Sequence, residues 1–181
     1  MSSISIIAIN GNQIDKTSEI FDAFKYIDLH HDKQFYSLDS CVTYLNENYF
    51  DSSKKNIALR GLWTLNGWTI IWDPEMVDMT DETAMETFSQ KLNVEVLTFL
   101  IQTTSGSFGF AKYNRTKQRK FYSTDGRIAE NFGSPLTEEK GLNINQNIFI
   151  NDVLQLANKF GIDIEAKNTK TTFLVKELGY N

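Results

Sequence analysis

The chain is poor in the residues that form disulfides and metal sites. Its 181 residues include one cysteine, Cys41, and two histidines, His30 and His31. A single cysteine excludes an internal disulfide and favours a reducing compartment. Because catalytic metal sites need three or more converging ligands, two adjacent histidines with no third histidine are a weak basis for one.

Long apolar runs and recognisable catalytic motifs are also absent from the sequence. The apolar run from Ile4 to Ile9 is interrupted by Ser5, and no run approaches the roughly 18 apolar residues of a membrane span. A signal peptide requires a basic segment before its apolar run, and none precedes this one. The serines and glycines at 105–107 and 133–135 match neither a phosphate-binding loop nor a nucleophile elbow. We therefore expect a cytoplasmic protein without a membrane partner or a cofactor, and we do not expect an enzyme.

The composition is acidic and rich in aromatic side chains. The net charge is −5, and the chain holds 13 Phe, 7 Tyr and 3 Trp residues. This acidic balance argues against general nucleic-acid binding. A chain of this length with 41% hydrophobic residues can bury a substantial core, so we expect a single domain over residues 1–181.

The stretch 94–124 predicts a meander of three antiparallel strands. A two-residue turn at Ser105-Gly106 places Ile101 opposite Phe110, and a longer polar turn at 114–117 places Phe110 opposite Phe121. The three side chains then form one row across the strands. Two independently placed turns thus predict the same buried aromatic face.

A second hairpin surrounds Asn66-Gly67, the strongest turn signal in the chain. The expected register pairs Leu65 with Trp68, Trp63 with Ile70, and Gly61 with Trp72. All three tryptophans then share one face. We interpret that face as core, because tryptophan in a strand is usually buried; the alternative is a binding platform.

The remaining apolar patterns complete an α+β fold. They predict strands over 3–10 and 171–175, helices over 17–27, 38–49, 81–92 and 152–160, and a short helix capped by Ser134. Ser37 and Thr80 are the expected caps of the helices at 38–49 and 81–92. We therefore predict one α+β domain with a mostly antiparallel sheet, built from the tryptophan hairpin and the aromatic meander and packed with about four helices.

Two polar clusters are candidate sites of lower weight. The segment Asp28–Asp32 holds His30, His31 and Asp32. We interpret it as a polar loop; the alternative is the site of a small metal-dependent or ligand-binding enzyme. The tip of the meander at 112–120 carries five basic residues, so a weak RNA contact is a third hypothesis beside that of a solvated turn. These residues are Lys112, Arg115, Lys117, Arg119 and Lys120.

An acidic stretch follows the tryptophan hairpin. Between residues 73 and 86 there are six carboxylates and no basic residue. We expect five of them to face a basic partner surface, because opposite charges raise the rate of association; the alternative is a solvated loop. These five are Asp73, Glu75, Asp78, Asp81 and Glu82.

Several short motifs resemble small bacterial immunity proteins, which are encoded beside polymorphic toxins and neutralise them by binding. The matching residues run from Leu62-Trp63 and Gly67-Trp68 through Phe88-Ser89, Phe108-Gly109-Phe110, Arg119 and Gly126 to Glu130-Asn131-Phe132-Gly133-Ser134-Pro135-Leu136 and Glu139. The likeness covers roughly residues 60–161. It implies a protein-binding module that blocks a cognate toxin by occlusion and performs no chemistry. In our hypothesis the domain of the toxin that it binds is basic.

Overall fold

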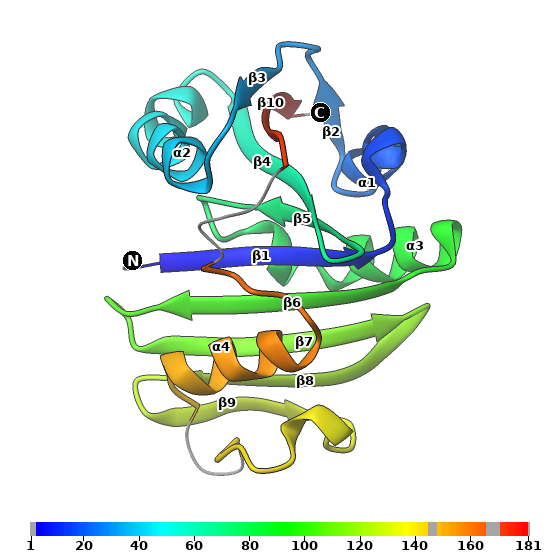
Figure 1. Cartoon of the computed structure of the whole chain (residues 1–181), viewed down its shortest axis with the longest axis vertical. Helices are drawn as coiled ribbons and strands as arrows, with labels where there is room; N and C mark the ends of the chain where they lie inside the picture. The colour runs from blue at the N-terminus through cyan, green and yellow to red at the C-terminus, as the bar shows by residue number, and fades with distance from the viewer. Residues whose placement is uncertain (1–2, 145–147, 166–170, 181) are drawn as a thin grey trace.

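The computed structural model of the chain describes residues 3–144, 148–165 and 171–180, and it shows a single α+β domain (Figure 1). The ten strands within these described residues form one antiparallel open sheet in the order β2-β10-β4-β5-β1-β6-β7-β8-β9, and β3 also pairs with β10. The strands are β1 Ser3–Asn10, β2 Tyr26–Asp28, β3 Lys33–Phe35, β4 Ile57–Leu65, β5 Trp68–Trp72, β6 Glu95–Gln102, β7 Ser107–Asn114, β8 Thr116–Thr124, β9 Arg127–Phe132 and β10 Phe173–Tyr180. The predicted fold class is confirmed.

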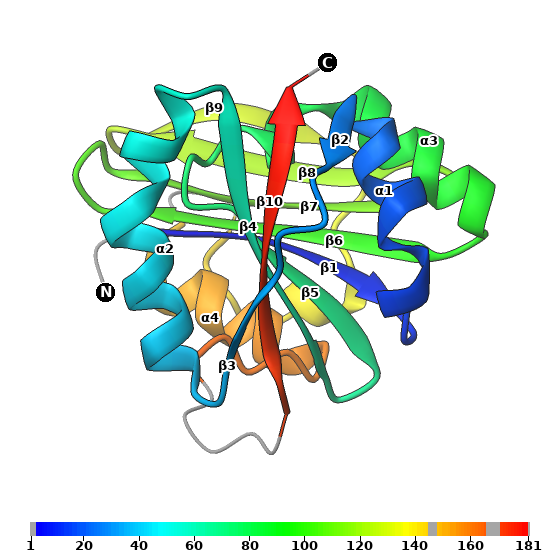
Figure 2. The ribbon, with the colours of Figure 1, turned by 90° about the horizontal axis from the view of Figure 1, so that it is seen from above.

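In the part of the chain that the structure describes, four α-helices cover the two faces of the sheet. They are α1 Thr17–Ala23, α2 Leu38–Ser53, α3 Glu82–Leu92 and α4 Ile150–Lys159, and short 3-10 turns lie at Ile14–Lys16, Asp78–Thr80 and Thr137–Glu139. Side chains of α2 and α4 enter one hydrophobic cluster, and those of α1 and α3 enter the other. Figure 2 shows β4 and β10 crossing the direction of β1 and β6, so the sheet is strongly twisted between its two halves.

The tryptophan hairpin has the predicted register and lies in the core. Leu65 pairs with Trp68, Trp63 with Ile70, and Gly61 with Trp72, and all three tryptophans are buried. A Cβ atom at Gly61 would lie 2.9 Å from Leu45 Cδ1 and 3.2 Å from Trp72 Cβ, so these side chains fill the space that the glycine leaves. The core interpretation of this aromatic face is confirmed.

The meander keeps one of its two predicted pairings, although neither turn is as predicted. The second turn is shorter than 114–117, since Asn114 pairs with Thr116 and Tyr113 with Lys117, and a bulge between Lys112 and Tyr113 restores the register. Phe110 lies opposite Phe121, as predicted. However, Ile101 lies opposite Phe108, and Phe99 takes the place opposite Phe110. The reason is that four residues make the first turn, so that Gln102 rather than Thr104 pairs with Ser107. A shift of two residues keeps every side chain on its predicted face.

Several predicted boundaries are wrong at segment ends. The helix predicted over 17–27 ends at Ala23, because Lys25 has φ +62° and the next residues form β2. The last strand reaches Tyr180. Ser134 caps no helix; the short turn there is a 3-10 helix that begins at Thr137. The segment 127–132, to which no strand was assigned, forms β9.

The two expected caps have different outcomes. Ser37 caps α2, where its Oγ accepts a hydrogen bond of 3.2 Å from the Ser40 nitrogen, and this helix continues to Ser53. Asp81, not Thr80, caps α3; its Oδ1 accepts a hydrogen bond of 2.9 Å from the Ala84 nitrogen. Aspartate is the stronger of the two capping residues.

We expect Phe110→Ala to destabilise the protein by about 3–5 kcal/mol, the usual cost of deleting a buried aromatic side chain. Phe110 is 2% exposed and stacks with Phe121 at a centroid distance of 6.4 Å. Chemical denaturation of the variant measures this loss. Phe149→Ala is the matched control, because Phe149 is 58% exposed; equal denaturation midpoints for the two variants would show that the aromatic row is misplaced.

Candidate functional site

A buried arginine lies at the centre of the acidic stretch. Arg60 is in β4, on the face opposite the tryptophans, and its side chain is fully buried. The surrounding strand, IALRGLWTL, is otherwise almost entirely apolar. Arg60 was not among the predicted site residues. Since a buried guanidinium must have a carboxylate partner, an arginine inside such a strand is the sequence signal that could have identified this cluster.

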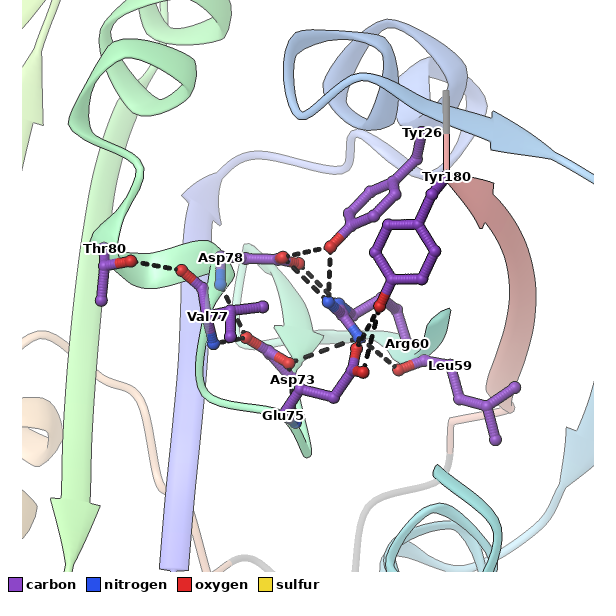
Figure 3. A network of polar contacts seen from close by, with 9 residues as sticks. All are labelled: Tyr26, Leu59, Arg60, Asp73, Glu75, Val77, Asp78, Thr80 and Tyr180. Carbon is purple, nitrogen blue, oxygen red and sulfur yellow. Dashed lines mark hydrogen bonds and ion pairs between the residues drawn. The ribbon is translucent and has the colours of Figure 1, made fainter. Parts of the chain in front are cut away.

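Arg60 binds the acidic stretch through several charge-assisted hydrogen bonds (Figure 3). Its Nε and Nη2 donate to the two carboxylate oxygens of Asp78, at 2.5 and 2.8 Å. Its Nη1 donates to Glu75 Oε2 at 2.8 Å and to the carbonyl oxygen of Leu59 at 2.9 Å. Asp73 Oδ1 lies 3.4 Å from the same Nη1 atom. One guanidinium therefore fixes three carboxylates of the segment.

Asp73 orders the backbone that follows it. Its Oδ1 accepts a hydrogen bond from the Glu75 nitrogen at 2.9 Å. Its Oδ2 accepts bonds from the nitrogens of Val77 and Asp78, at 2.7 and 2.8 Å. A loop whose amides bind a buried carboxylate has little conformational freedom, so the path from the hairpin to α3 is fixed from within.

Two tyrosines complete the cluster. The Tyr26 hydroxyl donates to Asp78 Oδ1 and accepts from Arg60 Nη2, both at 2.7 Å. The Tyr180 hydroxyl donates to Glu75 at 3.1 Å, and its ring packs edge-on against that of Tyr26. Tyr180 is 44% exposed, so it marks the place where the cluster reaches the surface.

The cluster carries an excess of negative charge, because three carboxylates surround one guanidinium in the described structure. Burial raises the pKa of Asp73 to about 6, against the lowering effect of Arg60. Burial also acts to lower the pKa of Arg60, but Asp73 and Asp78 outweigh it and hold that pKa well above its usual range. Burial and the adjacent Glu75 raise the pKa of Tyr180 to about 12.

The prediction of a free acidic surface at 73–82 needs correction. Asp73 and Asp78 are buried against Arg60 and are not available to a partner. Asp81 is exposed but caps α3. Glu82 binds two lysines of β8. The chain can hold these carboxylates close together because each binds a cation or a backbone amide of the protein itself. The cations lie outside the stretch, so the stretch alone gave no sign of them.

Glu82 belongs to a ring of alternating charges that joins α3 to β8 and β9. Lys117 Nζ lies 2.7 Å from Glu82 and 3.4 Å from Glu130. Lys120 Nζ lies 2.7 Å from the same two glutamates. Each carboxylate thus bridges both lysines. Partial burial acts to raise the pKa of Glu82, but hydrogen bonds from Lys117 and Lys120 outweigh it and lower that pKa.

The other basic residues of the meander tip also have partners within the chain. Lys112 pairs with Glu95 at 2.7 Å, and the Arg115 guanidinium donates to Asn93 Oδ1 at 2.7 and 3.1 Å. Arg119 is fully buried. The expected basic patch at 112–120 is therefore wrong as a free cationic surface, because strand alternation sends its side chains to two faces, where carboxylates and amides neutralise or bind them.

Arg119 forms a second buried clamp. It donates to both Glu139 oxygens at 2.7 and 2.9 Å, to Asn131 Oδ1 at 2.6 Å and to the Phe132 carbonyl oxygen at 2.8 Å. A Cβ atom at Gly133 would lie 2.1 Å from the Gln118 carbonyl oxygen, so only glycine fits there. The motif residues from Glu130 to Glu139 thus fasten β9 and the following 3-10 turn to the sheet.

The two histidines do not converge on one site. His30 Nδ1 lies 3.6 Å from Asp28, whereas His31 Nδ1 lies 3.5 Å from Glu177. The Lys176 ammonium lies between Asp28 and Asp32, 2.9 and 3.0 Å from their oxygens, where a cation bridging them would lie. Within residues 3–144, 148–165 and 171–180, no group of three or more His, Cys, Asp and Glu could hold a metal ion.

Cys41 lies on the buried side of α2, and burial raises the pKa of its thiol to about 12. A nucleophilic cysteine needs a lowered pKa, so this residue packs as a small apolar side chain.

Comparisons with protein-family models, curated proteins and solved structures gave no match to this chain. Among the helices that the structure describes, none has the length and apolar character needed to span a membrane.

We expect Arg60→Met to destabilise the protein by about 3–5 kcal/mol at neutral pH, because it leaves buried carboxylates without their cation. Those carboxylates should then have raised pKa values, so the stability of the variant should increase as the pH falls. Tyr180→Phe is the control, since it removes one hydrogen bond at the surface. Denaturation of Arg60→Met that matches the control at every pH would contradict the assignment of Arg60 as the organising charge.

We expect Glu82→Gln to lower the free energy of unfolding by about 1 kcal/mol at neutral pH, the scale of partly exposed ion pairs. The pKa of Glu82 is lowered in the folded state, so its contribution is present above the unfolded pKa, about 4.3, and lost as the pH falls. Denaturation at neutral and acidic pH should show the two proteins converging in acid. A difference that persists at low pH would rule out the charge ring as its source.

Proposed function

We propose that this protein is a cytoplasmic protein-binding module of the immunity type, which neutralises a cognate bacterial toxin by direct binding and performs no chemistry. The resemblance of residues 60–161 to immunity proteins supports this proposal. The residues that carry the resemblance build the tryptophan hairpin and the Arg119 clamp, so they argue for a shared fold more than for a shared contact surface.

The observation that carries the proposal is the internal order of the acidic stretch. Arg60 binds carboxylates of the stretch from inside the protein, and Asp73 binds backbone amides of the same stretch. A partner that docks here meets a surface that is already ordered. Preorganisation increases affinity because little conformational entropy is lost on binding.

The surface of this segment combines charge with apolar area. Val77 is 47% exposed and Tyr180 44% exposed, and Glu75 binds the hydroxyl group of Tyr180. Asp81 is exposed at the start of α3. Exposed tyrosine is enriched at protein interfaces, and the excess negative charge around Arg60 favours a cationic partner surface. The proposed partner is therefore a basic domain of the toxin.

The test replaces two carboxylates and leaves Asp73 and Asp78, the fully buried partners of Arg60, in place. Glu75→Gln keeps one acceptor oxygen for Arg60 and offers an amide group that can donate to the Tyr180 hydroxyl, and Asp81→Asn keeps a good helix cap. Asp78 is left unchanged, because its replacement would leave the buried guanidinium of Arg60 without its bidentate carboxylate partner. We expect the double variant to associate more slowly with the product of the neighbouring gene, with a flatter dependence of rate on salt and an almost unchanged denaturation midpoint.

The matched control is the double variant Asp39→Asn and Glu47→Gln, which removes the same charge from exposed positions of α2. If both double variants slow association equally, the effect comes from net charge and the acidic stretch is not the contact surface. If the wild-type protein does not bind the neighbouring-gene product at all, the proposed function itself is wrong.

A further inference from the structure

The tip of the tryptophan hairpin carries an exposed Asn-Gly pair in which both residues have positive φ angles. Asn66 and Gly67 have φ values of +49° and +84°, as the type I′ turn between β4 and β5 requires, and both residues are exposed. Apart from Gly67 and its two chain neighbours, no atom of the described structure lies within 4 Å of the place that a Cβ atom of Gly67 would occupy, so the turn is open on that side.

This tip is tied to a distant part of the chain. Asn66 Nδ2 donates a hydrogen bond of 3.0 Å to the Gly161 carbonyl oxygen. Trp68 Nε1 donates another, also of 3.0 Å, to the Phe160 carbonyl oxygen. Both acceptors lie just beyond the end of α4, where the chain needs partners for its last carbonyl groups. The amide group of Asn66 therefore helps to hold α4 against the hairpin.

We propose that Asn66 is a site of spontaneous deamidation, and that this modification weakens the contact between the tip of the hairpin and the end of α4. The Gly67 nitrogen loses its proton and attacks Cγ of Asn66. The bond from Cγ to Nδ2 breaks, ammonia leaves, and a five-membered succinimide forms. Water then opens the ring at one of its two carbonyl carbons, giving aspartate or isoaspartate, with no change in oxidation state.

The chain holds a second Asn-Gly pair that serves as an internal comparison. Asn10-Gly11 ends β1, and there the Gly11 nitrogen donates a hydrogen bond of 2.7 Å to the Gly67 carbonyl oxygen. The Gly67 nitrogen makes no such bond within the residues that the structure describes. The Gly11 nitrogen is thus held by a backbone acceptor, whereas no backbone hydrogen bond within the described residues holds the Gly67 nitrogen.

The type I′ conformation keeps the reaction slow. The Gly67 nitrogen reaches Cγ of Asn66 only when the turn opens locally, so the native rate depends on that opening. The three rates should therefore rank in a fixed order: fastest at either asparagine in the denatured chain, slower at native Asn66, and slowest at native Asn10.

The product has a direct structural consequence. Aspartate at position 66 presents oxygen where the amide donated to the Gly161 carbonyl group, so a hydrogen bond is replaced by repulsion between two acceptors. Isoaspartate also adds a methylene group to the backbone of a two-residue turn. Either product weakens the contact between the hairpin and α4.

The test incubates the full-length native protein and a urea-denatured sample in mildly alkaline buffer until both asparagines of the denatured sample have converted. Trypsin releases peptide 61–91, in which Asn66 is the single asparagine, and peptide 1–16, which holds Asn10 and Asn12. Mass spectrometry then follows the conversion of amide to acid at each site. We expect several-fold faster conversion at native Asn66 than at native Asn10.

Equal or faster conversion at native Asn10, or an Asn66 that stays intact while the denatured sample converts, would overturn the proposal. The variant Asn66→Asp tests the structural consequence separately. We expect its Gly161 and Ile162 amides, which donate to Asn158 and Ala157, to exchange hydrogen several-fold faster than in the wild type. Unchanged exchange there would show that Asn66 does not hold α4.

Discussion

The ion pair between Arg60 and Asp78 is the constraint on which the conformation of the acidic stretch depends. A guanidinium in the middle of a buried strand is costly unless carboxylates accept its hydrogen bonds. The chain meets this requirement by folding the segment after the tryptophan hairpin back over β4, where Asp78 binds Arg60 at two atoms. The position of the first turn of α3 follows from that contact, because Asp81 caps the helix only three residues later.

Arg119 imposes the same kind of constraint at the other end of the sheet. It pairs with Glu139 and binds Asn131, so the edge strand β9 and the 3-10 turn after it are fixed together. The two buried arginines thus fasten the two polar segments that leave the sheet, while apolar packing of two helices on each face supplies the core. The polar segments are thus ordered by charges inside the protein.

The sequence predicted the parts of the fold that depend on local signals. Asn66-Gly67 specifies a two-residue turn, so the register of its hairpin was correct. The turn before Ser107 has no equally specific signal, and its length was wrong by two residues. The acidic stretch and Arg60 in its apolar strand were both visible, but their pairing was not, since Arg60 lies 18 positions before Asp78 and only folding brings them together. Pairing across such distances has no local pattern.

The central claim is that Arg60 and Asp73 hold the acidic stretch in one conformation before any partner binds. Native-state hydrogen exchange measures this most directly, at the amides of Glu75, Val77 and Asp78, which donate to Asp73. The structure predicts slow exchange at all three, with protection that is lost together in Arg60→Met. Exchange of these amides at the rate of an unstructured loop in the wild-type protein would contradict the claim.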